Sequence, residues 1–199
     1  MNEHYYTQSP RSRSEERRFE TEFAGETYTF LYDNGVFSKG RLDDGTRILL
    51  EALPAIGGDV LDLGCGWGPV GTILGHRYPK ARILMTDVNE RALELAGKNL
   101  LLNRVTNAQT RESDGFAGIE ERFDCIVTNP PIRAGKQLIY ALFDEALGHL
   151  KLGGALYIVI RRQQGAESAL RYLEKADAEV IEREKGYWVI RCEHGAQAL

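Results

Sequence analysis

Short apolar runs alternate along this chain with longer segments in which apolar residues recur at helical spacing. The runs have the length and composition of buried strands and occupy residues 59–63, 81–86, 108–112, 123–128 and 155–160. The helical patterns lie between them, at residues 69–78, 89–100 and 135–150. Strands separated by helices of this length form parallel sheets that are covered on both faces. The pattern therefore predicts an α/β fold with a mostly parallel sheet.

The two ends of this pattern predict antiparallel hairpins instead. Near the N-terminus, β-forming residues at 18–23 and 27–32 flank a short glycine-containing turn. Near the C-terminus, residues 179–185 and 187–192 are joined through Gly186. This connection leaves no room for a crossover helix, so the last two strands must pair antiparallel.

The segments before residue 35 are predicted to form a separate extension. Residues 1–16 are polar and lack periodicity, which predicts a loosely docked arm. A helical pattern at residues 44–53 ends before Pro54. We therefore divide the chain into an arm and hairpin at 1–34 and one domain at 35–199.

The composition is that of an ordinary globular protein. Apolar residues make up 43% of the chain and charged residues 27%, which is enough for a full core. No apolar run approaches the roughly 18 residues that cross a bilayer. The N-terminus lacks the basic flank and apolar core of a secretory signal. We expect a cytoplasmic protein with no membrane partner.

The cysteines and histidines predict neither a disulfide framework nor a metal site. The three cysteines lie far apart, and none belongs to a C-x-x-C pair. The four histidines are equally scattered and show no ligand spacing. We expect no bound metal.

The charge balance argues against a protein that binds polyanions with its whole surface. The formal net charge is −4, although four arginines crowd the N-terminal region, at Arg11, Arg13, Arg17 and Arg18. Acidic residues stand between them, and such mixed runs are usually solvated faces. An RNA contact there is the alternative interpretation.

A glycine cluster follows the first strand of the predicted sheet. The loop reads Asp62-Leu63-Gly64-Cys65-Gly66-Trp67-Gly68 and lies where doubly wound sheets bind ligands, beyond the carboxyl ends of the strands. Its glycines allow the backbone to approach a ligand closely, and the following helix offers N–H groups. Asp87 ends the second strand beside the loop, where a carboxylate can accept hydrogen bonds from both hydroxyls of a ribose. These residues predict a nucleotide site.

Two kinds of nucleotide fit this loop. Gly66-x-Gly68-x-x-Gly71 satisfies the dinucleotide pattern, with Asp87 at about the expected distance of 20 residues. A nicotinamide-dependent oxidoreductase therefore stays open on these residues alone. The glycines already begin at Gly64, directly after Asp62, which resembles the D-x-G-x-G-x-G signature of class I methyltransferases.

The most unusual feature is the corner Asn129-Pro130-Pro131-Ile132 after the fourth parallel strand. Proline lacks a backbone N–H and restricts the chain, so this corner is stiff and rich in acceptors. The acceptors are the side-chain oxygen of Asn129 and the carbonyl oxygen of Pro130. Methylation of an exocyclic amine requires such a pair, because its nitrogen lone pair is delocalised into the ring. Two acceptors that bind its N–H groups direct the lone pair toward a methyl donor, so catalysis rests on orientation.

The corner carries a resemblance to a known family. Asn-Pro-Pro followed by an aromatic residue marks adenine-N6 and glutamine-N5 methyltransferases, but here Ile132 takes the aromatic position. Asn-Pro-Pro-Ile followed by Arg133-Ala134-Gly135-Lys136 resembles the ribosomal RNA guanine-N2 methyltransferases of the RsmC family. Similar segments are found at residues 35–38, 42–46 and 159–166, so the similarity covers nearly the whole chain.

The resemblance implies a seven-stranded, Rossmann-like class I methyltransferase fold that uses S-adenosylmethionine and acts on ribosomal RNA or a ribosomal subunit. The implied cofactor residues are Asp62, Gly64, Cys65, Gly66, Gly68, Asp87, Val88, Ser113, Asp114 and Asn129. Asn129 and the Pro130 carbonyl would orient the amine, and Pro131 and Ile132 would shape the base pocket. Ser113 and Asp114 occupy the position from which methyltransferases often hold the adenine amino group, although a solvated turn acid looks identical.

Basic residues follow the fourth and fifth parallel strands and are expected at the same mouth. Arg133, Lys136, Arg161 and Arg162 are candidates for RNA phosphate contacts, with ordinary surface charge as the alternative. Ile132 also removes one face for base stacking. Phe37 and Trp188 are candidate replacements, but we interpret both as core residues.

Three other functions stay open at this point. The first is methylation of a protein glutamine or a small-molecule amide, because it presents the same planar nitrogen. The second is the nicotinamide oxidoreductase, which leaves the Asn-Pro-Pro corner unexplained. The third is a catalytically silent RNA-binding module, against which the intact corner argues.

Overall fold

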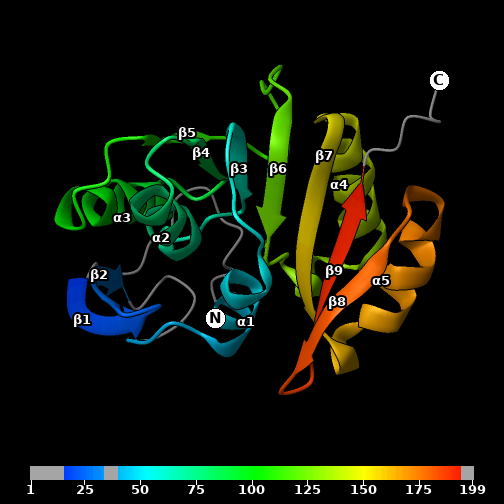
Figure 1. The fold of residues 1–199 in the computed structure, drawn as a ribbon, viewed down its shortest axis with the longest axis horizontal. Helices are drawn as coiled ribbons and strands as arrows, with labels where there is room; N and C mark the ends of the chain where they lie inside the picture. The colour runs from blue at the N-terminus through cyan, green and yellow to red at the C-terminus, as the bar shows by residue number, and fades with distance from the viewer. Residues whose placement is uncertain (1–15, 34–39, 194–199) are drawn as a thin grey trace, which may run out of the picture.

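A computed structural model describes residues 16–33 and 40–193, and its main body is a seven-stranded sheet (Figure 1). The strand order is β5-β4-β3-β6-β7-β9-β8. The strands are β3 (Asp59–Leu63), β4 (Arg82–Asp87), β5 (Ala108–Glu112), β6 (Phe123–Thr128), β7 (Leu150–Arg161), β8 (Glu179–Glu184) and β9 (Tyr187–Glu193). The first five run parallel, and β9 pairs antiparallel with β7 and β8. The predicted fold class is confirmed.

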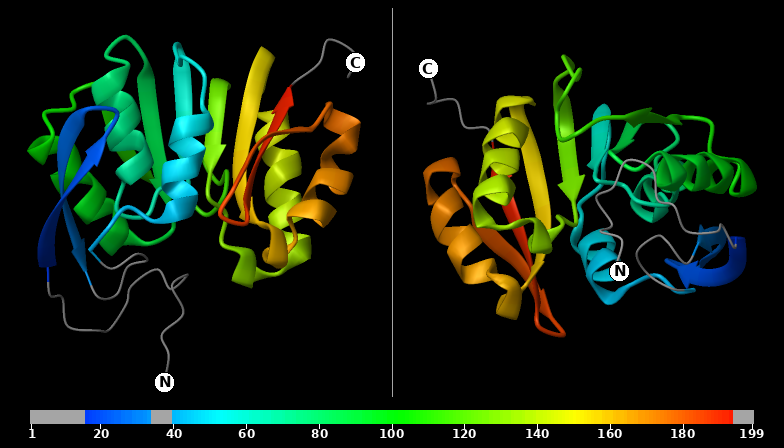
Figure 2. Two further views of the ribbon diagram at one scale, coloured as in Figure 1. Left: turned by 60° about the horizontal axis from the view of Figure 1, so that its bottom comes forward. Right: turned by 180° about the vertical axis from the view of Figure 1, so that it is seen from behind.

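Helices cover both faces of this sheet (Figure 2). One face carries α1 (Asp44–Ala52), α2 (Pro69–Arg77) and α3 (Glu90–Leu102), and the other carries α4 (Lys136–Gly148) and α5 (Ala166–Leu173). Three short 3-10 turns, at Ile132–Ala134, Arg162–Gln164 and Glu174–Ala176, adjoin α4 and α5. The buried side chains form one apolar cluster on each face of the sheet.

The helix starts follow from local hydrogen bonding. Asp43 caps α1 by accepting a hydrogen bond from the Thr46 N–H at 3.0 Å. Asn89 caps α3 in the same way, as its position in the sequence predicts. Pro69 occupies the first position of α2. An N–H at this position would have no partner within the helix, so its absence in proline costs no hydrogen bond.

Two elements differ from the sequence-based expectation. β7 begins at Leu150 rather than at residue 155, because Gly153 and Gly154 do not end the strand but produce an irregular pairing with β6. A Cβ at Gly154 would lie 2.8 Å from the Phe123 carbonyl oxygen, so only glycine fits between these strands. Helix α5 was not predicted, although its buried residues Ala166, Ala169 and Leu173 have helical spacing.

The predicted N-terminal hairpin consists of β1 (Glu16–Phe23) and β2 (Glu26–Asp33) and packs beside α3. The Asn103 side chain bonds both the N–H and the carbonyl of Thr29, at 3.0 and 2.7 Å. One turn earlier, Asn99 bonds both groups of Leu31, at 2.7 and 3.0 Å. Successive outward-facing peptides of β2 are thus bonded to two side chains of α3.

The hairpin also packs against the glycine loop. The Trp67 ring lies edge-on to Phe30, with 4.9 Å between ring centroids, and edge-on to Phe19 at 5.7 Å. Asn99, which is fully buried, donates a further hydrogen bond to the Trp67 carbonyl at 2.8 Å. One side chain therefore connects the hairpin, α3 and the glycine loop.

Candidate functional site

The predicted site residues converge where the strand order reverses. The chain passes from β3 outward to β4 and β5, then crosses to β6 on the other side of β3. Leu63 at the end of β3 pairs with Thr128 at the end of β6, and the Thr128 hydroxyl donates to the Leu63 carbonyl at 2.9 Å. Gly64 and Asn129 follow these two residues directly. The glycine loop and the Asn-Pro-Pro corner are therefore neighbours at the place where doubly wound sheets bind ligands.

The glycine loop is held by two buried carboxylates. Asp62 is 3% exposed and accepts a hydrogen bond from the Gly71 N–H of α2 at 2.8 Å. Asp87 is 6% exposed and accepts hydrogen bonds from the Gly66 N–H at 2.8 Å and the Asn89 N–H at 2.9 Å. The structure therefore assigns both carboxylates a role in shaping the loop, beyond the ligand contacts that the sequence predicts.

Burial changes the ionisation of these carboxylates. Loss of hydration raises the pKa of Asp62 to about 7, although the Gly71 N–H opposes the shift. Burial also raises the pKa of Asp87, against the hydrogen bonds from Asn89 and Gly66. Two neighbouring buried carboxylates favour a ligand that brings positive charge near them.

The loop glycines divide into those that pack against protein and those that face open space. A Cβ at Gly68 would lie 2.6 Å from Met85 Cε, and one at Gly71 would lie 2.5 Å from Met85 Sδ. A Cβ at Gly64, where φ is +71°, would meet nothing within 4 Å. Gly64 thus faces open space, whereas Gly68 allows the start of α2 to approach Ala96 of α3, and Gly71 allows α2 to pack on Met85 of β4.

The remaining predicted cofactor positions lie at the same edge of the sheet. Cys65 is buried, and burial raises the pKa of its thiol well above the usual value, so it is no nucleophile. Val88 follows Asp87 and is half-buried. The Ser113 N–H donates to the Asp87 carbonyl at 3.1 Å, while its hydroxyl bonds the carbonyls of Gly115 and Ala117. Asp114 is exposed beside it. Their contacts with a cofactor stay predictions.

The Asn129 side chain belongs to a directed chain of hydrogen bonds. The Thr46 hydroxyl lies 2.6 Å from an Asp43 carboxylate oxygen and 3.4 Å from the Asn129 side-chain nitrogen. A carboxylate only accepts, so the Thr46 proton points to Asp43 and the hydroxyl accepts from Asn129. This arrangement turns the nitrogen of Asn129 toward α1 and its oxygen away from Thr46. Sequence reasoning missed Asp43 and Thr46 as supports of the corner.

The acceptor pair predicted at this corner remains available. Among the described residues, neither the Asn129 side-chain oxygen nor the Pro130 carbonyl oxygen accepts a hydrogen bond. Pro130 is buried, and Pro131 and Ile132 are half-buried. The Pro131 carbonyl is occupied, because it accepts from the Ala134 N–H at 2.8 Å. The structure thus brings Asn129 and Pro130 together with two unused acceptors.

The predicted RNA-binding residues have different surroundings. Arg161 is exposed at the end of β7, and its guanidinium lies over the Tyr187 ring, 4.9 Å from the centroid. Arg162 forms an ion pair with Glu167 at 3.0 Å, as expected of ordinary surface charge. Lys136 is exposed at the start of α4, and the Arg133 side chain lies outside the described part of the structure. Phe37 and residues 35–38 also lie outside it.

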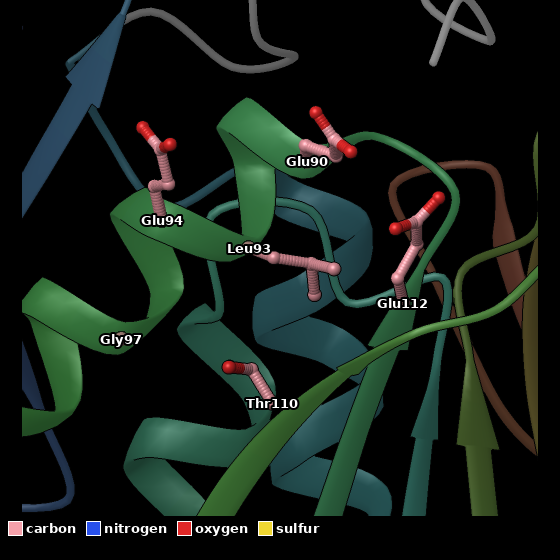
Figure 3. Close-up of a pocket in the computed structure, with 6 residues that line it drawn as sticks. All are labelled: Glu90, Leu93, Glu94, Gly97, Thr110 and Glu112. Carbon is pink, nitrogen blue, oxygen red and sulfur yellow. The ribbon is translucent and has the colours of Figure 1, made fainter. Parts of the chain in front are cut away.

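A concave feature lies away from this corner, along the β5 edge. It is a groove of about 450 Å³ between α3 and β5, lined by Glu90, Leu93, Glu94, Gly97, Thr110 and Glu112 (Figure 3). Its three carboxylates, Glu90, Glu94 and Glu112, disfavour phosphate groups within the groove itself. Within residues 16–33 and 40–193, no group of three His, Cys, Asp or Glu side chains is arranged to hold a metal ion. The same residues contain no helix long and apolar enough to span a bilayer.

Comparison with known families gives one match that covers most of the chain. Residues 27–191 match the model of the methyltransferase small domain. The matched segment includes β2 from its second residue onward, the glycine loop and the Asn-Pro-Pro corner.

Individual relatives fall into two groups by length. The Bacillus subtilis protein called uncharacterized protein YbxB is 41% identical over 197 residues, which are 96% of this chain and 98% of the relative. Ribosomal RNA small subunit methyltransferase C of Aeromonas hydrophila is 39% identical over 154 residues, which are 75% of this chain but 43% of the relative. The chain therefore spans less than half the length of that enzyme.

Among solved structures, the chain is similar to a T. thermophilus 16S rRNA N2 methyltransferase, RsmC, in complex with AdoMet and guanosine. The TM-score is 0.80 at 30% sequence identity, and the match covers 92% of this chain and 52% of that one.

Proposed function

This chain belongs to the methyltransferase small domain family, and from that premise we propose that it methylates an exocyclic amine of an RNA base with S-adenosylmethionine. Guanine N2 of ribosomal RNA is the proposed acceptor, supported by the similarity to RsmC over most of this chain. The observation that carries the proposal is the position of Asn129 directly beside Gly64, through the pairing of Thr128 with Leu63.

The residues of the glycine loop fit S-adenosylmethionine. Gly64 faces open space, so the loop can accept a ligand against its backbone. Asp62 and Asp87 are buried carboxylates with raised pKa values, which a cation stabilises in their ionised forms. S-adenosylmethionine brings an ammonium and a sulfonium and supplies an electrophilic methyl group when bound. We assign Gly64, Asp62 and Asp87 to its binding.

The corner then acts on the acceptor nitrogen. The Asn129 side-chain oxygen and the Pro130 carbonyl oxygen accept hydrogen bonds from the two N–H groups of the amine. Thr46 and Asp43 keep the amide from turning, so the oxygen stays directed at the substrate without a search. As the nitrogen gains its methyl group it becomes cationic and acidic, and it releases one proton to water. No strong base is required.

The test follows a labelled methyl group. The purified chain is incubated with S-adenosylmethionine carrying a tritiated methyl group and with small-subunit ribosomal RNA, ribosomal protein or assembled subunits. We expect label in RNA and, after nucleoside digestion, in N2-methylguanosine. Label confined to protein contradicts the RNA assignment. The two cofactors are also compared by calorimetric titration. Binding of NADH without binding of S-adenosylmethionine contradicts the whole proposal.

Asn129→Ala separates the mechanism from cofactor binding. It removes one acceptor and leaves Gly64 and Asp87 intact, so turnover should fall by about 100-fold while affinity for S-adenosylmethionine stays within a few-fold. Full turnover in the variant removes the proposed role of Asn129.

A further inference from the structure

Tyr187 pairs with Arg161, and the proposed function assigns no role to this tyrosine ring. They lie directly opposite each other in the antiparallel pairing of β7 with β9. The Arg161 guanidinium lies 4.9 Å from the Tyr187 ring centroid, which is a cation–π contact. Arg161 is exposed and Tyr187 half-buried. Between described residues, Arg161 forms no ion pair, so its charge is directed at the ring rather than at a carboxylate.

The pair lies on the same face of the sheet as the acceptor corner. Side chains of a strand alternate between its faces, so Asn129 continues the face of Val127, and Arg161 that of Val159. Val127 and Val159 both belong to the apolar cluster under α1, and Tyr187 packs against that cluster. Asn129, Arg161 and Tyr187 therefore share one face at the carboxyl end of the sheet.

Helix α1 connects the Tyr187 ring to Asn129. A Cβ at Gly45 would lie 2.9 Å from Tyr187 Cε1, so the ring rests against the backbone of the first turn of α1. The next residue, Thr46, holds the Asn129 amide. Glycine is a poor helix former. At this position, however, the absence of a side chain leaves the space that the Tyr187 ring occupies. In Figure 1, α1 and the turn between β8 and β9 lie at the same end of the molecule.

Such a pair has the chemistry that recognises a nucleobase. Unstacked RNA bases bind to aromatic rings and to guanidinium planes, and both are present here in one cation–π pair. Ile132 cannot supply a ring, and it packs against the cluster of α4 and α5. Tyr187 rests on Gly45, one residue before the Thr46 that bonds Asn129. Trp188 cannot serve, because it points to the opposite face and packs against the cluster of α4 and α5. A glutamine side chain has no aromatic ring and offers a much smaller planar surface, so it gains less from the pair than a base does.

We propose that Tyr187 and Arg161 are the stacking platform for the target base, which selects an unpaired or flipped RNA base over a protein amide. The inference rests on the proposed function, because it assigns the ligand of the same corner. The base stacks on the guanidinium that Tyr187 supports, while its exocyclic amine reaches Asn129.

The test uses a single-stranded oligoribonucleotide that contains one 2-aminopurine, whose fluorescence is quenched when the base stacks. Tyr187→Leu should weaken binding of this probe by about 5- to 100-fold and abolish the quenching, and Tyr187→Phe should stay within about 3-fold of the wild type. Arg161→Gln should weaken binding by at least about 5-fold. The affinity for S-adenosylmethionine, measured by calorimetry, should not change in any of the three.

Arg183→Gln is the matched control. Arg183 also lies over a ring, with its guanidinium 4.7 Å from the Trp188 centroid, but that ring packs against the opposite face of the sheet. Loss of the same probe affinity in Arg183→Gln assigns the effect to bulk charge and overturns the platform. The platform is also overturned if Tyr187→Leu, with an unchanged circular dichroism spectrum, binds and quenches the probe as the wild type does.

The outcomes separate the two proposals. If the protein methylates RNA but Tyr187→Leu leaves the KM for RNA unchanged, the platform is wrong and the function stands. If the probe binds and is quenched but no methyl group reaches RNA, the proposed function is wrong and the base site stands.

Discussion

The side-chain nitrogen of Asn129 lies 3.4 Å from the hydroxyl oxygen of Thr46, a residue 83 positions earlier in the chain. The contact joins the start of α1 to the end of β6. Because Thr46 donates its only proton to Asp43, it must accept from Asn129, and the orientation of the amide follows from this chain of donors.

Thr46→Val should therefore lower turnover without affecting the cofactor. Valine keeps the size of threonine but cannot accept a hydrogen bond, so the Asn129 amide can rotate. We expect kcat to fall by about 10-fold, with the affinity for S-adenosylmethionine unchanged. Thr72→Val is the control, because the buried Thr72 hydroxyl has no hydrogen-bond partner in the described part of the chain. It should leave kcat unaltered. Equal kcat in the two variants contradicts the positioning role.

Gly64 and Gly68 should respond differently to alanine. At Gly68, φ is +85° and the new Cβ would lie 2.8 Å from Ala96 Cβ, so α3 must shift. We expect the free energy of unfolding to fall by about 2–4 kcal/mol. At Gly64 the space is open, so Gly64→Ala should cost only about 1 kcal/mol. It should nevertheless weaken S-adenosylmethionine binding by more than 10-fold. Urea denaturation and calorimetry measure the two effects, and tight cofactor binding by Gly64→Ala would place the cofactor elsewhere.

Asp62 should make stability depend on pH. Its pKa is about 7 in the folded protein and near 3.8 in the unfolded chain, so the folded state holds the proton more tightly. Its contribution to stability is thus greatest at low pH and is lost as pH rises from about 4 to 7. Asp62→Asn, which can still accept from the Gly71 N–H, should gain stability relative to the wild type over this range, by an amount on the order of a few kcal/mol. Urea denaturation at pH 5, 6, 7 and 8 measures it. A constant difference between the two proteins refutes the assignment.

Asn99→Ala should loosen the hairpin and the glycine loop together. It removes the partners of both Leu31 backbone groups and of the Trp67 carbonyl, so we expect a loss of about 2–4 kcal/mol in the free energy of unfolding. Asn103→Ala breaks only half-buried contacts, so it should lower the free energy of unfolding by less than Asn99→Ala does. Hydrogen exchange of the Leu31 and Gly66 amides should accelerate in the first variant. Acceleration at Leu31 alone would show that the loop is held independently of the hairpin.

The sequence predicts the parts of this site that depend on short segments. The strand ends, the glycine loop and the stiff Asn129-Pro130-Pro131 corner are each local, and the order of strands and helices places them at one edge of the sheet. The number of strands and their antiparallel ending also follow from spacing alone.

Long-range contacts account for what the sequence does not predict. Nothing near Asn129 indicates that Thr46 holds it, and nothing near Tyr187 indicates that Gly45 receives its ring. Arg161 and Arg162 are adjacent arginines that the sequence does not distinguish. Their side chains nevertheless point in different directions at the end of the strand, so Arg161 contacts the Tyr187 ring and Arg162 pairs with Glu167. Gly45 is the only local hint, as a glycine within a helical pattern.

The two asparagines of α3 also determine what β2 cannot bind. A strand at the edge of a sheet exposes unpaired N–H and carbonyl groups that can recruit a strand from another molecule. Asn99 and Asn103 occupy those groups at Leu31 and Thr29, so a helix seals the border of the ribbon that a neighbouring strand would join. Along that border, the protein protects itself from intermolecular β-pairing with two amide side chains instead of a third strand.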